Sequence, residues 1–227
     1  MKNNVCRIKL LNENKGTGFF CKFSYNNKIL PVLITNNHVI NKEILNKNEK
    51  ILIIINNEER EIELKDRIKY TNEEYDITII EIKEKEDKIN KYLEIDDKII
   101  GNKSNISYIK ESIYIIQYEG EKDEVSISYG IIKGIDEKDN YTFKHFSCTD
   151  KGSSGSPILN INNNKIIGIH KESSSKDNRG TFLNYAIQDF INKNNKKNND
   201  IKEINIVNNL KNKNALEEFN KKYNLKY

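Results

Sequence analysis

Cysteine is scarce in this sequence: its 227 residues include only three, Cys6, Cys21 and Cys148. Because the number is odd, at least one thiol stays unpaired unless two chains cross-link. The sequence shows neither a CxxC pair nor a Cys/His spacing typical of zinc ligands. A chain of this length can bury a sizeable core without cross-links or metal. We therefore expect no metal site and a reducing, cytoplasmic setting.

Long apolar runs are also missing. No segment approaches the length of apolar chain that a bilayer span requires, and residues 1–11 alternate charged with apolar residues instead of forming the apolar centre of a signal peptide. No basic stripe stands out either, because 38 lysines and arginines are interspersed with 34 acidic residues. Such mixing is typical of a solvated surface. We expect no membrane partner and no nucleic-acid partner.

The apolar residues that are present come in short, mostly β-branched runs such as Ile51–Ile55, Ile77–Ile80 and Ile113–Ile116. Runs of this kind, separated by turn residues, predict strands of an all-β barrel or sandwich. The expected strands are Gly18–Tyr25, Lys28–Thr35, Lys50–Asn56, Glu59–Leu64, Ile77–Ile82, Ile106–Ile109, Ser112–Tyr118, Glu124–Gly130, Thr142–Ser147, Pro157–Asn160, Lys165–His170 and Thr181–Ala186.

Changes in composition divide the chain into four predicted segments. Residues 1–85 form the first half, 86–104 a charged, irregular linker, 105–193 the second half with a helix from Ile187, and 194–227 an Asn/Lys-rich linker and tail. In that tail, Asn214 and Glu217 have the form of a helix cap, and Leu216, Phe219 and Tyr223 share one helical face. We expect the tail to pack on the body or on a protein partner.

The strongest chemical signal is the segment Gly152-Ser153-Ser154-Gly155-Ser156-Pro157, followed by two apolar residues. A nucleophilic serine needs a hydroxyl exposed on a tight turn, with backbone N–H groups aimed where an oxyanion will form. Glycines beside the serine allow that curl. The plainer alternative is a Ser/Gly loop without a chemical role.

Two further segments complete the pattern. His38 ends the run Ile34-Thr35-Asn36-Asn37-His38, and Asp76 precedes the apolar run Ile77-Thr78-Ile79-Ile80. A histidine in such a place can act as a general base. Taken singly, such a histidine is more often a structural residue, and such an aspartate more often simply begins a strand.

Together the three segments resemble the motifs of chymotrypsin-like serine peptidases, namely Gly-x-Ser-Gly-Gly/Ser-Pro, a histidine motif especially like that of bacterial HtrA-type proteases, and Asp-Ile-Ala-Leu. They also occur in the His, Asp, Ser order of that class, whereas an α/β-hydrolase runs Ser, Asp, His with Gly-x-Ser-x-Gly. The resemblance covers roughly residues 16–193. It implies two six-stranded β-barrels with His38, Asp76 and Ser154 as a triad between them. It also implies an oxyanion hole made by the N–H groups of Gly152 and Ser154, with no cofactor.

The residues around the nucleophile bear on substrate preference. Cys148 stands where trypsin-like enzymes carry the aspartate that selects Lys or Arg. Thr149 and His170 resemble the threonine and histidine that hold the P1 carboxylate in V8-type glutamyl endopeptidases, and Ser173 can add a hydroxyl. Picornaviral proteases use a similar pair for P1 Gln, so Glu and Gln stay open, as does an apolar P1. The alternative for His170 is a core histidine, and His145, which matches no motif, is expected to be structural.

Ser153 occupies the place where trypsin-like zymogens carry an aspartate that pairs with a newly cut N-terminus. We therefore expect an oxyanion hole formed as translated, or formed when a partner binds. The sequence thus predicts a serine endopeptidase that acts on a polypeptide through an acyl-enzyme. The competing hypothesis is a protease fold kept as a peptide-binding module with little or no turnover.

Overall fold

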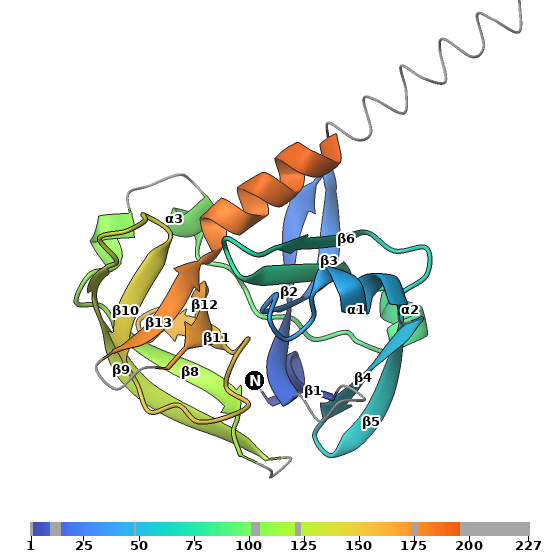
Figure 1. The fold of residues 1–227 in the computed structure, drawn as a ribbon, viewed down its shortest axis with the longest axis horizontal. Helices are drawn as coiled ribbons and strands as arrows, with labels where there is room; N and C mark the ends of the chain where they lie inside the picture. The colour runs from blue at the N-terminus through green and yellow to red at the C-terminus, as the bar shows by residue number, and fades with distance from the viewer. Residues whose placement is uncertain are drawn as a thin grey trace, which may run out of the picture. The chain divides into compact units, whose positions relative to one another are not determined.

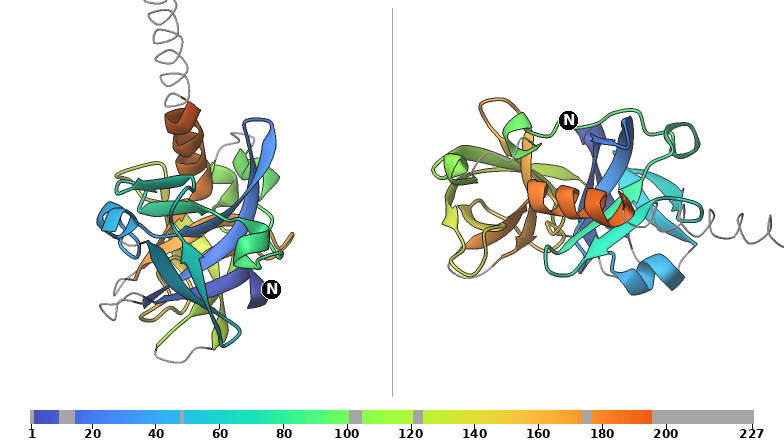
Figure 2. Two further views of the ribbon diagram at one scale, coloured as in Figure 1. Left: turned by 90° about the vertical axis from the view of Figure 1, so that its right-hand side faces the viewer. Right: turned by 90° about the horizontal axis from the view of Figure 1, so that it is seen from above.

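Two antiparallel β-sheets make up most of the fold (Figure 1). The structure is a computed structural model that describes residues 2–9, 15–47, 49–100, 105–120, 124–173 and 177–195. Both sheets belong to one compact unit, residues 1–186, and a second unit begins at Ile187. In Figures 1 and 2 the second sheet, coloured green to orange, lies beside the first, coloured blue to teal.

The first sheet has seven strands in the order β5-β4-β1-β2-β3-β7-β6. They are β1 (Val5–Lys9), β2 (Lys15–Tyr25), β3 (Lys28–Thr35), β4 (Lys50–Ile55), β5 (Glu58–Glu63), β6 (Lys69–Asn72) and β7 (Ile77–Glu81). The β2–β3 hairpin turns at Asn26 and Asn27, whose φ angles are 50° and 58°. Asparagine tolerates these positive values, which a two-residue hairpin turn requires, so the predicted hairpin is confirmed.

The second sheet is a closed barrel of six strands in the order β10-β13-β12-β11-β8-β9. They are β8 (Ser112–Tyr118), β9 (Val125–Ile135), β10 (Thr142–Phe146), β11 (Pro157–Asn160), β12 (Ile166–Glu172) and β13 (Asn178–Phe182). Phe143 and Phe182 meet in its core with ring centroids 4.4 Å apart. Alternation along each strand sends such apolar side chains inward, as a closed barrel demands.

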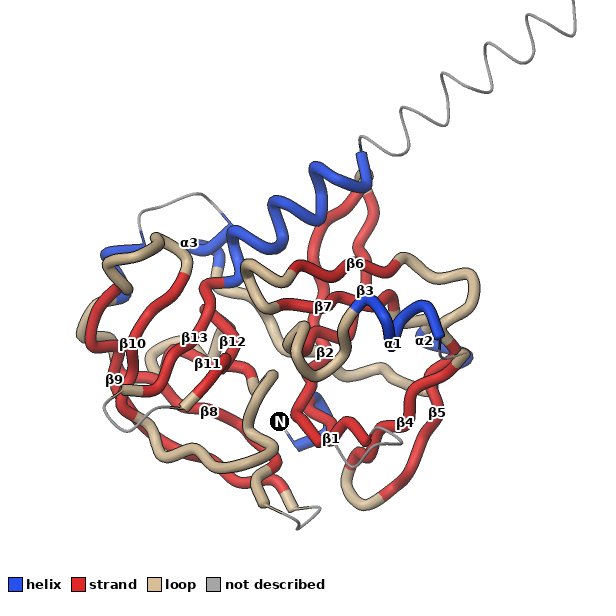
Figure 3. The backbone as a smooth tube through the Cα atoms, in the orientation of Figure 1, coloured by secondary structure: helices blue, strands red, loops and turns tan. Residues whose placement is uncertain are grey.

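Short helices connect the strands (Figure 3). They are η1 (Lys2–Asn4), α1 (Lys42–Lys47), α2 (Glu84–Asp87), α3 (Asp97–Ile100) and η2 (Asn105–Tyr108), and a further helix covers residues 183–195. Every helix in the described part of the chain is too short or too polar to cross a bilayer. All three cysteines are free: Cys6 and Cys21 are buried, and Cys148 is exposed.

The all-β prediction is confirmed, with corrections in detail. The first sheet has seven strands, where the resemblance implied six and the apolar runs predicted five. The two unpredicted strands, β1 and β6, are short, carry several charged or polar residues and show no clear strand pattern. Ile106–Ile109, expected as a strand, falls mostly in the helical turn η2. The last strand ends at Phe182, and the helix expected from Ile187 begins at Leu183.

The four-segment division of the chain stays a prediction. Within the expected linker, Leu93 forms an isolated bridge with Cys21 of the first sheet, and Ile95 forms one with Ile166 of the second. This stretch therefore contacts both sheets along its course. The predicted tail helix lies outside the described residues.

Candidate active site

A cavity of about 600 Å³ opens between loops of the two sheets. Its lining includes His38 and Asp76 from the first sheet and Ser154 from the second. Three predicted substrate-binding residues, Thr149, His170 and Ser173, line it as well. Gly152 is not among the lining residues. The structure therefore brings six of the seven predicted site residues to one cavity.

His38 and Asp76 meet because their strands are neighbours. His38 lies in the turn after β3 and Asp76 immediately precedes β7, and these strands pair with Thr35 opposite Thr78. Asp76 Oδ2 lies 2.7 Å from His38 Nδ1, and Asp76 Oδ1 accepts the backbone N–H of His38 at 2.9 Å. A carboxylate can only accept, so Nδ1 carries a proton, and in the neutral imidazole the lone pair is then on Nε2. The ring is thus held in the tautomer that a general base needs.

The backbone around Asp76 is held as firmly as its side chain. Asp76 has φ +51°, in the left-handed region that few residues other than glycine adopt. The side-chain amide of Asn36 donates to the Asp76 carbonyl oxygen at 2.8 Å. The Asp76 side chain is 10% exposed and the His38 side chain 48% exposed. The carboxylate is therefore buried behind an imidazole that reaches solvent.

The turn that carries Ser154 depends on two glycines. Gly152 has φ +92° and Gly155 has φ +89°, values that residues with a side chain rarely adopt. At Gly155 a Cβ atom would also lie 2.0 Å from the carbonyl oxygen of Thr17, so the turn passes too close to β2 for any side chain. The Ser154 carbonyl accepts the Thr17 N–H at 2.8 Å, and the Gly155 N–H donates to the His170 carbonyl at 3.0 Å. Both sheets thus hold the turn.

The loop before Ser154 presents backbone N–H groups. The Lys151 carbonyl accepts the Gly120 N–H at 2.7 Å, and in a trans peptide the next N–H points the opposite way. In the described part of the chain, neither the Gly152 nor the Ser154 N–H donates a hydrogen bond to the protein. Ser153 instead bonds within its own turn, where its hydroxyl accepts the Asp150 N–H at 3.1 Å.

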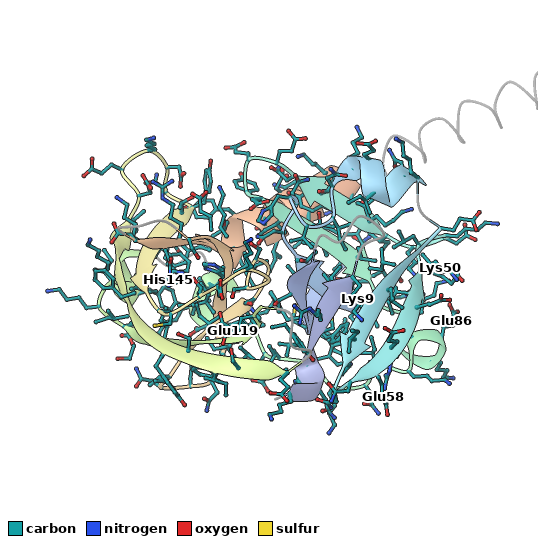
Figure 4. All side chains as sticks on the ribbon, turned by 60° about the horizontal axis from the view of Figure 1, so that its bottom comes forward. Lys9, Lys50, Glu58, Glu86, Glu119 and His145 are labelled. Carbon is teal, nitrogen blue, oxygen red and sulfur yellow. The ribbon has the colours of Figure 1, made fainter. Side chains whose placement is uncertain are left out.

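The polar side chains beside this turn form a chain of contacts. Thr149 Oγ1 lies 2.6 Å from Ser173 Oγ, which lies 3.5 Å from His170 Nε2. His170 Nδ1 in turn lies 3.2 Å from Nε2 of His145, which is fully buried in the second barrel (Figure 4). His145, expected to be structural, thus stands directly behind a predicted substrate-binding residue. Sequence spacing could not show this, because β13 lies between their strands, β10 and β12.

Both of these imidazoles are neutral at pH 7. Burial lowers the pKa of His145 to about 4. Burial, and then the nearby imidazoles of His145 and His38, lowers the pKa of His170 to about 3. A neutral imidazole has one donor and one acceptor nitrogen. His170 therefore offers a directed hydrogen bond without a formal charge.

Four charged residues that the sequence motifs did not single out complete the cavity: Asp150, Lys151, Lys171 and Glu172. Their charges are two positive and two negative, so the lining has no net charge from them. No hydrogen bond joins His38 to Ser154 among the described residues, as is common for such pairs without substrate. In the same part of the chain no three His, Cys, Asp or Glu side chains cluster as a metal site would need.

Comparisons with known proteins bear on this arrangement. A family model described as a trypsin-like peptidase domain matches residues 16–169, more than half of the chain. No curated protein matches the sequence.

Solved structures share the fold. A serine endoprotease from Yersinia pestis is similar with a TM-score of 0.61 and 16% identity, over 84% of this chain and 64% of that protein. A human pathogenic astrovirus serine protease is similar with a TM-score of 0.55 and 16% identity, over 80% of this chain and 90% of that one. A protease from M. tuberculosis, solved in an inactive form, has a TM-score of 0.56 at 14% identity, over 80% and 84%.

At these identities the structural likenesses show the fold alone, and that fold is the chymotrypsin-like one that the sequence predicts. The chain spans 64% of the length of the Yersinia protein. The family match is independent of them and includes His38, Asp76 and Ser154 within its range. This chain therefore belongs to the trypsin-like peptidase domain family.

Proposed function

We propose that this chain is a serine endopeptidase in which Ser154 is the nucleophile, His38 the general base and Asp76 the residue that orients the base. One observation carries the proposal: the buried Asp76 carboxylate lies 2.7 Å from Nδ1 of an imidazole whose cavity also holds Ser154. A family of peptidases implies a polypeptide substrate.

The reaction follows from these atoms. Ser154 Oγ attacks the scissile carbonyl carbon while its proton passes to His38 Nε2, and Asp76 stabilises the resulting imidazolium. The carbonyl oxygen becomes an oxyanion held by the N–H groups of Gly152 and Ser154. As the C–N bond breaks, His38 returns the proton to the leaving amine. Water, deprotonated by His38, then attacks the acyl carbonyl carbon, and His38 returns that proton to Ser154 Oγ as the bond between the acyl carbon and Oγ breaks.

For P1 we propose Glu or Gln, bound by Thr149, His170 and Ser173, in a pocket similar to that of V8-type glutamyl endopeptidases. Hydroxyls and a neutral imidazole donate to a side-chain carbonyl or carboxylate oxygen. Cys148 lacks the carboxylate with which trypsin-like enzymes hold Lys or Arg. Because the nearby charged residues balance, the pocket selects by hydrogen bonding, and P1 Gln fits it as well as P1 Glu.

Covalent labelling tests the catalytic proposal. A fluorophosphonate probe should label the wild-type chain and not Ser154→Ala, and the substitution should lower kcat by about 10⁶-fold. Ser112→Ala, which removes an exposed serine on β8 outside the cavity, is the matched control and should label like wild type. If wild type and Ser154→Ala bind peptides equally and neither turns over nor labels, the chain is a peptide-binding module instead.

A peptide library with every P1 residue tests the pocket. Wild type should prefer Glu or Gln, and His170→Leu should lower kcat/KM for those peptides by about 10²-fold or more, because a substrate oxygen then loses its donor. Cleavage of a peptide with an apolar P1 residue by the same variant serves as the control and should change little. Equal losses for all P1 residues, or a wild-type preference for apolar P1, would contradict this assignment.

A further inference from the structure

Arg7 is a fully buried arginine that the proposed reaction does not use. It lies on β1 of the first sheet, and its guanidinium Nη2 donates to the carbonyl oxygen of Gly120, which follows β8 of the second. Arginine is almost never fully buried unless its charge is paired or hydrogen-bonded. The hydrogen-bond partner of this arginine therefore indicates what the buried side chain does.

Gly120 links Arg7 to the loop before the nucleophile. The Gly120 N–H donates to the Lys151 carbonyl at 2.7 Å, and this bond turns the Gly152 N–H of the same peptide in the opposite direction. Gly120 itself has φ +60°, a conformation that glycine adopts without steric cost. By fixing the Gly120 carbonyl, Arg7 holds the residue whose N–H orients the 151–152 peptide.

Thr17 reaches the same loop directly. It is fully buried on β2 and stands opposite Arg7 in the β1–β2 pairing. Its hydroxyl donates to the Gly152 carbonyl at 2.8 Å and accepts the Tyr118 N–H at 3.0 Å, while its own N–H donates to the Ser154 carbonyl at 2.8 Å. Within this cross-strand pair, Thr17 contacts the Gly152 and Ser154 carbonyls directly, and Arg7 reaches the loop through Gly120.

We propose that Arg7 and Thr17, here called the β1–β2 clamp, are positioning residues for the oxyanion hole. The inference rests on the proposed function. It adds that these two residues fix the conformation of the loop before Ser154. Without the clamp, the 151–152 peptide is held, among the described residues, only through Gly120, and its rotation would turn the Lys151 carbonyl, in place of the Gly152 N–H, toward the substrate. The clamp does not touch substrate, and its effect is confined to the step in which the carbonyl oxygen becomes negative.

Arg7 also places a positive charge close to this loop. A Cβ atom built on Gly152 would lie 3.6 Å from Arg7 Nη2. A buried cation near the oxyanion favours its charge in a poorly screened site. Arg7→Lys keeps the charge and N–H donors but loses the planar guanidinium, whereas Arg7→Met loses the charge and the donors. A loss in Arg7→Lys therefore reports the geometry of the guanidinium, and a further loss in Arg7→Met reports its charge and hydrogen bond together.

The test compares kcat, KM and inhibition by a peptide boronate, which forms a tetrahedral adduct with the serine. Thr17→Val keeps the shape of the side chain and removes its hydroxyl. We expect kcat and boronate affinity to fall together by about 10- to 100-fold, as expected when a catalytic group is misplaced, with KM within about threefold of wild type. Arg7→Met should show the same losses of kcat and boronate affinity. Thr17→Ser, which restores the hydroxyl, should recover kcat to within about threefold of wild type.

Arg67→Met is the matched control. Arg67 is also buried in the first-sheet half, where it is ion-paired with Asp87, and it does not line the cavity. Its loss should lower the melting temperature and leave kcat per folded molecule unchanged. Wild-type kcat in Arg7→Met and Thr17→Val, or losses that follow the fraction unfolded as in Arg67→Met, would overturn the inference.

Each of the remaining outcomes also supports or contradicts the inference. If Arg7→Met or Thr17→Val does not fold, Arg7→Lys is measured instead: lowered kcat at constant KM supports the clamp, and wild-type kcat contradicts it. If the wild type is active and Arg7→Met and Thr17→Val keep wild-type kcat, the clamp is refuted and the proposed function is not. A wild type that neither cleaves peptides nor reacts with the fluorophosphonate refutes the proposed function, and the clamp falls with it.

Discussion

Asp76 shows how much of a site can depend on one side chain. Its two carboxylate oxygens bind the ring Nδ1 and the backbone N–H of the same residue, His38. The first contact sets the tautomer of the imidazole, and the second sets the position of the turn. A single carboxylate thereby fixes both the chemistry and the location of the base.

Replacing this carboxylate by an amide should separate the two effects. Asp76→Asn can keep a hydrogen bond to the His38 backbone, but its NH₂ group favours the tautomer with Nε2 protonated. By analogy with a dissected serine protease, kcat should fall by about 10⁴-fold while KM changes little.

Steady-state kinetics with a cleaved peptide measures this effect. Asp97→Asn, which alters an exposed carboxylate in α3 whose side chain is 85% exposed, should leave both constants unchanged. A fall in kcat of less than tenfold for Asp76→Asn would show that Asp76 does not orient the base.

Among the elements, those with local causes could be predicted from the sequence. The β2–β3 hairpin follows from a two-residue Asn-Asn turn between an aromatic-rich run and an aliphatic run, and it is found with Tyr25 opposite Lys28. By contrast, β1 and β6 were not predicted, although each pairs with the next strand along the chain. They are short and carry several charged or polar residues, so they show no clear strand pattern. The segment Ile106–Ile109 has the composition of a strand, yet most of it forms the helical turn η2. Apolar composition alone does not distinguish a buried turn from a buried strand.

The same distinction holds for the candidate site: residues in short motifs could be predicted, and contacts between separate strands could not. Ser154, His38 and Asp76 each lie in a short motif, so the sequence could single them out, and the structure places all three on one cavity. The contact between His145 and His170 joins strands that share no edge, and the β1–β2 clamp joins the two sheets. Such contacts depend on how complete sheets assemble, and no local pattern records them.

For the whole molecule, the histidine pair links the substrate pocket to stability. His145 and His170 are buried and neutral, with pKa values of about 4 and about 3 in the folded chain. In the unfolded chain both return to the ordinary value of 6.5. Below about pH 6.5 the unfolded chain therefore binds protons that the folded chain cannot, and the free energy of unfolding falls as the pH falls. Well above pH 6.5 these two histidines no longer change the free energy of unfolding.

The size of the effect follows from proton linkage. Each depressed histidine costs about 1.4 kcal/mol per pH unit, so lowering the pH from 7 to 5 should cost the pair on the order of 4 kcal/mol. Urea denaturation at both pH values measures this loss in wild type and in a His145→Gln/His170→Gln variant. The double variant should lose clearly less stability over this range, although it is less stable at pH 7. An equal loss in both chains would show that these imidazoles are not the groups that bind protons on unfolding, and the view of the pocket as uncharged would have to be abandoned.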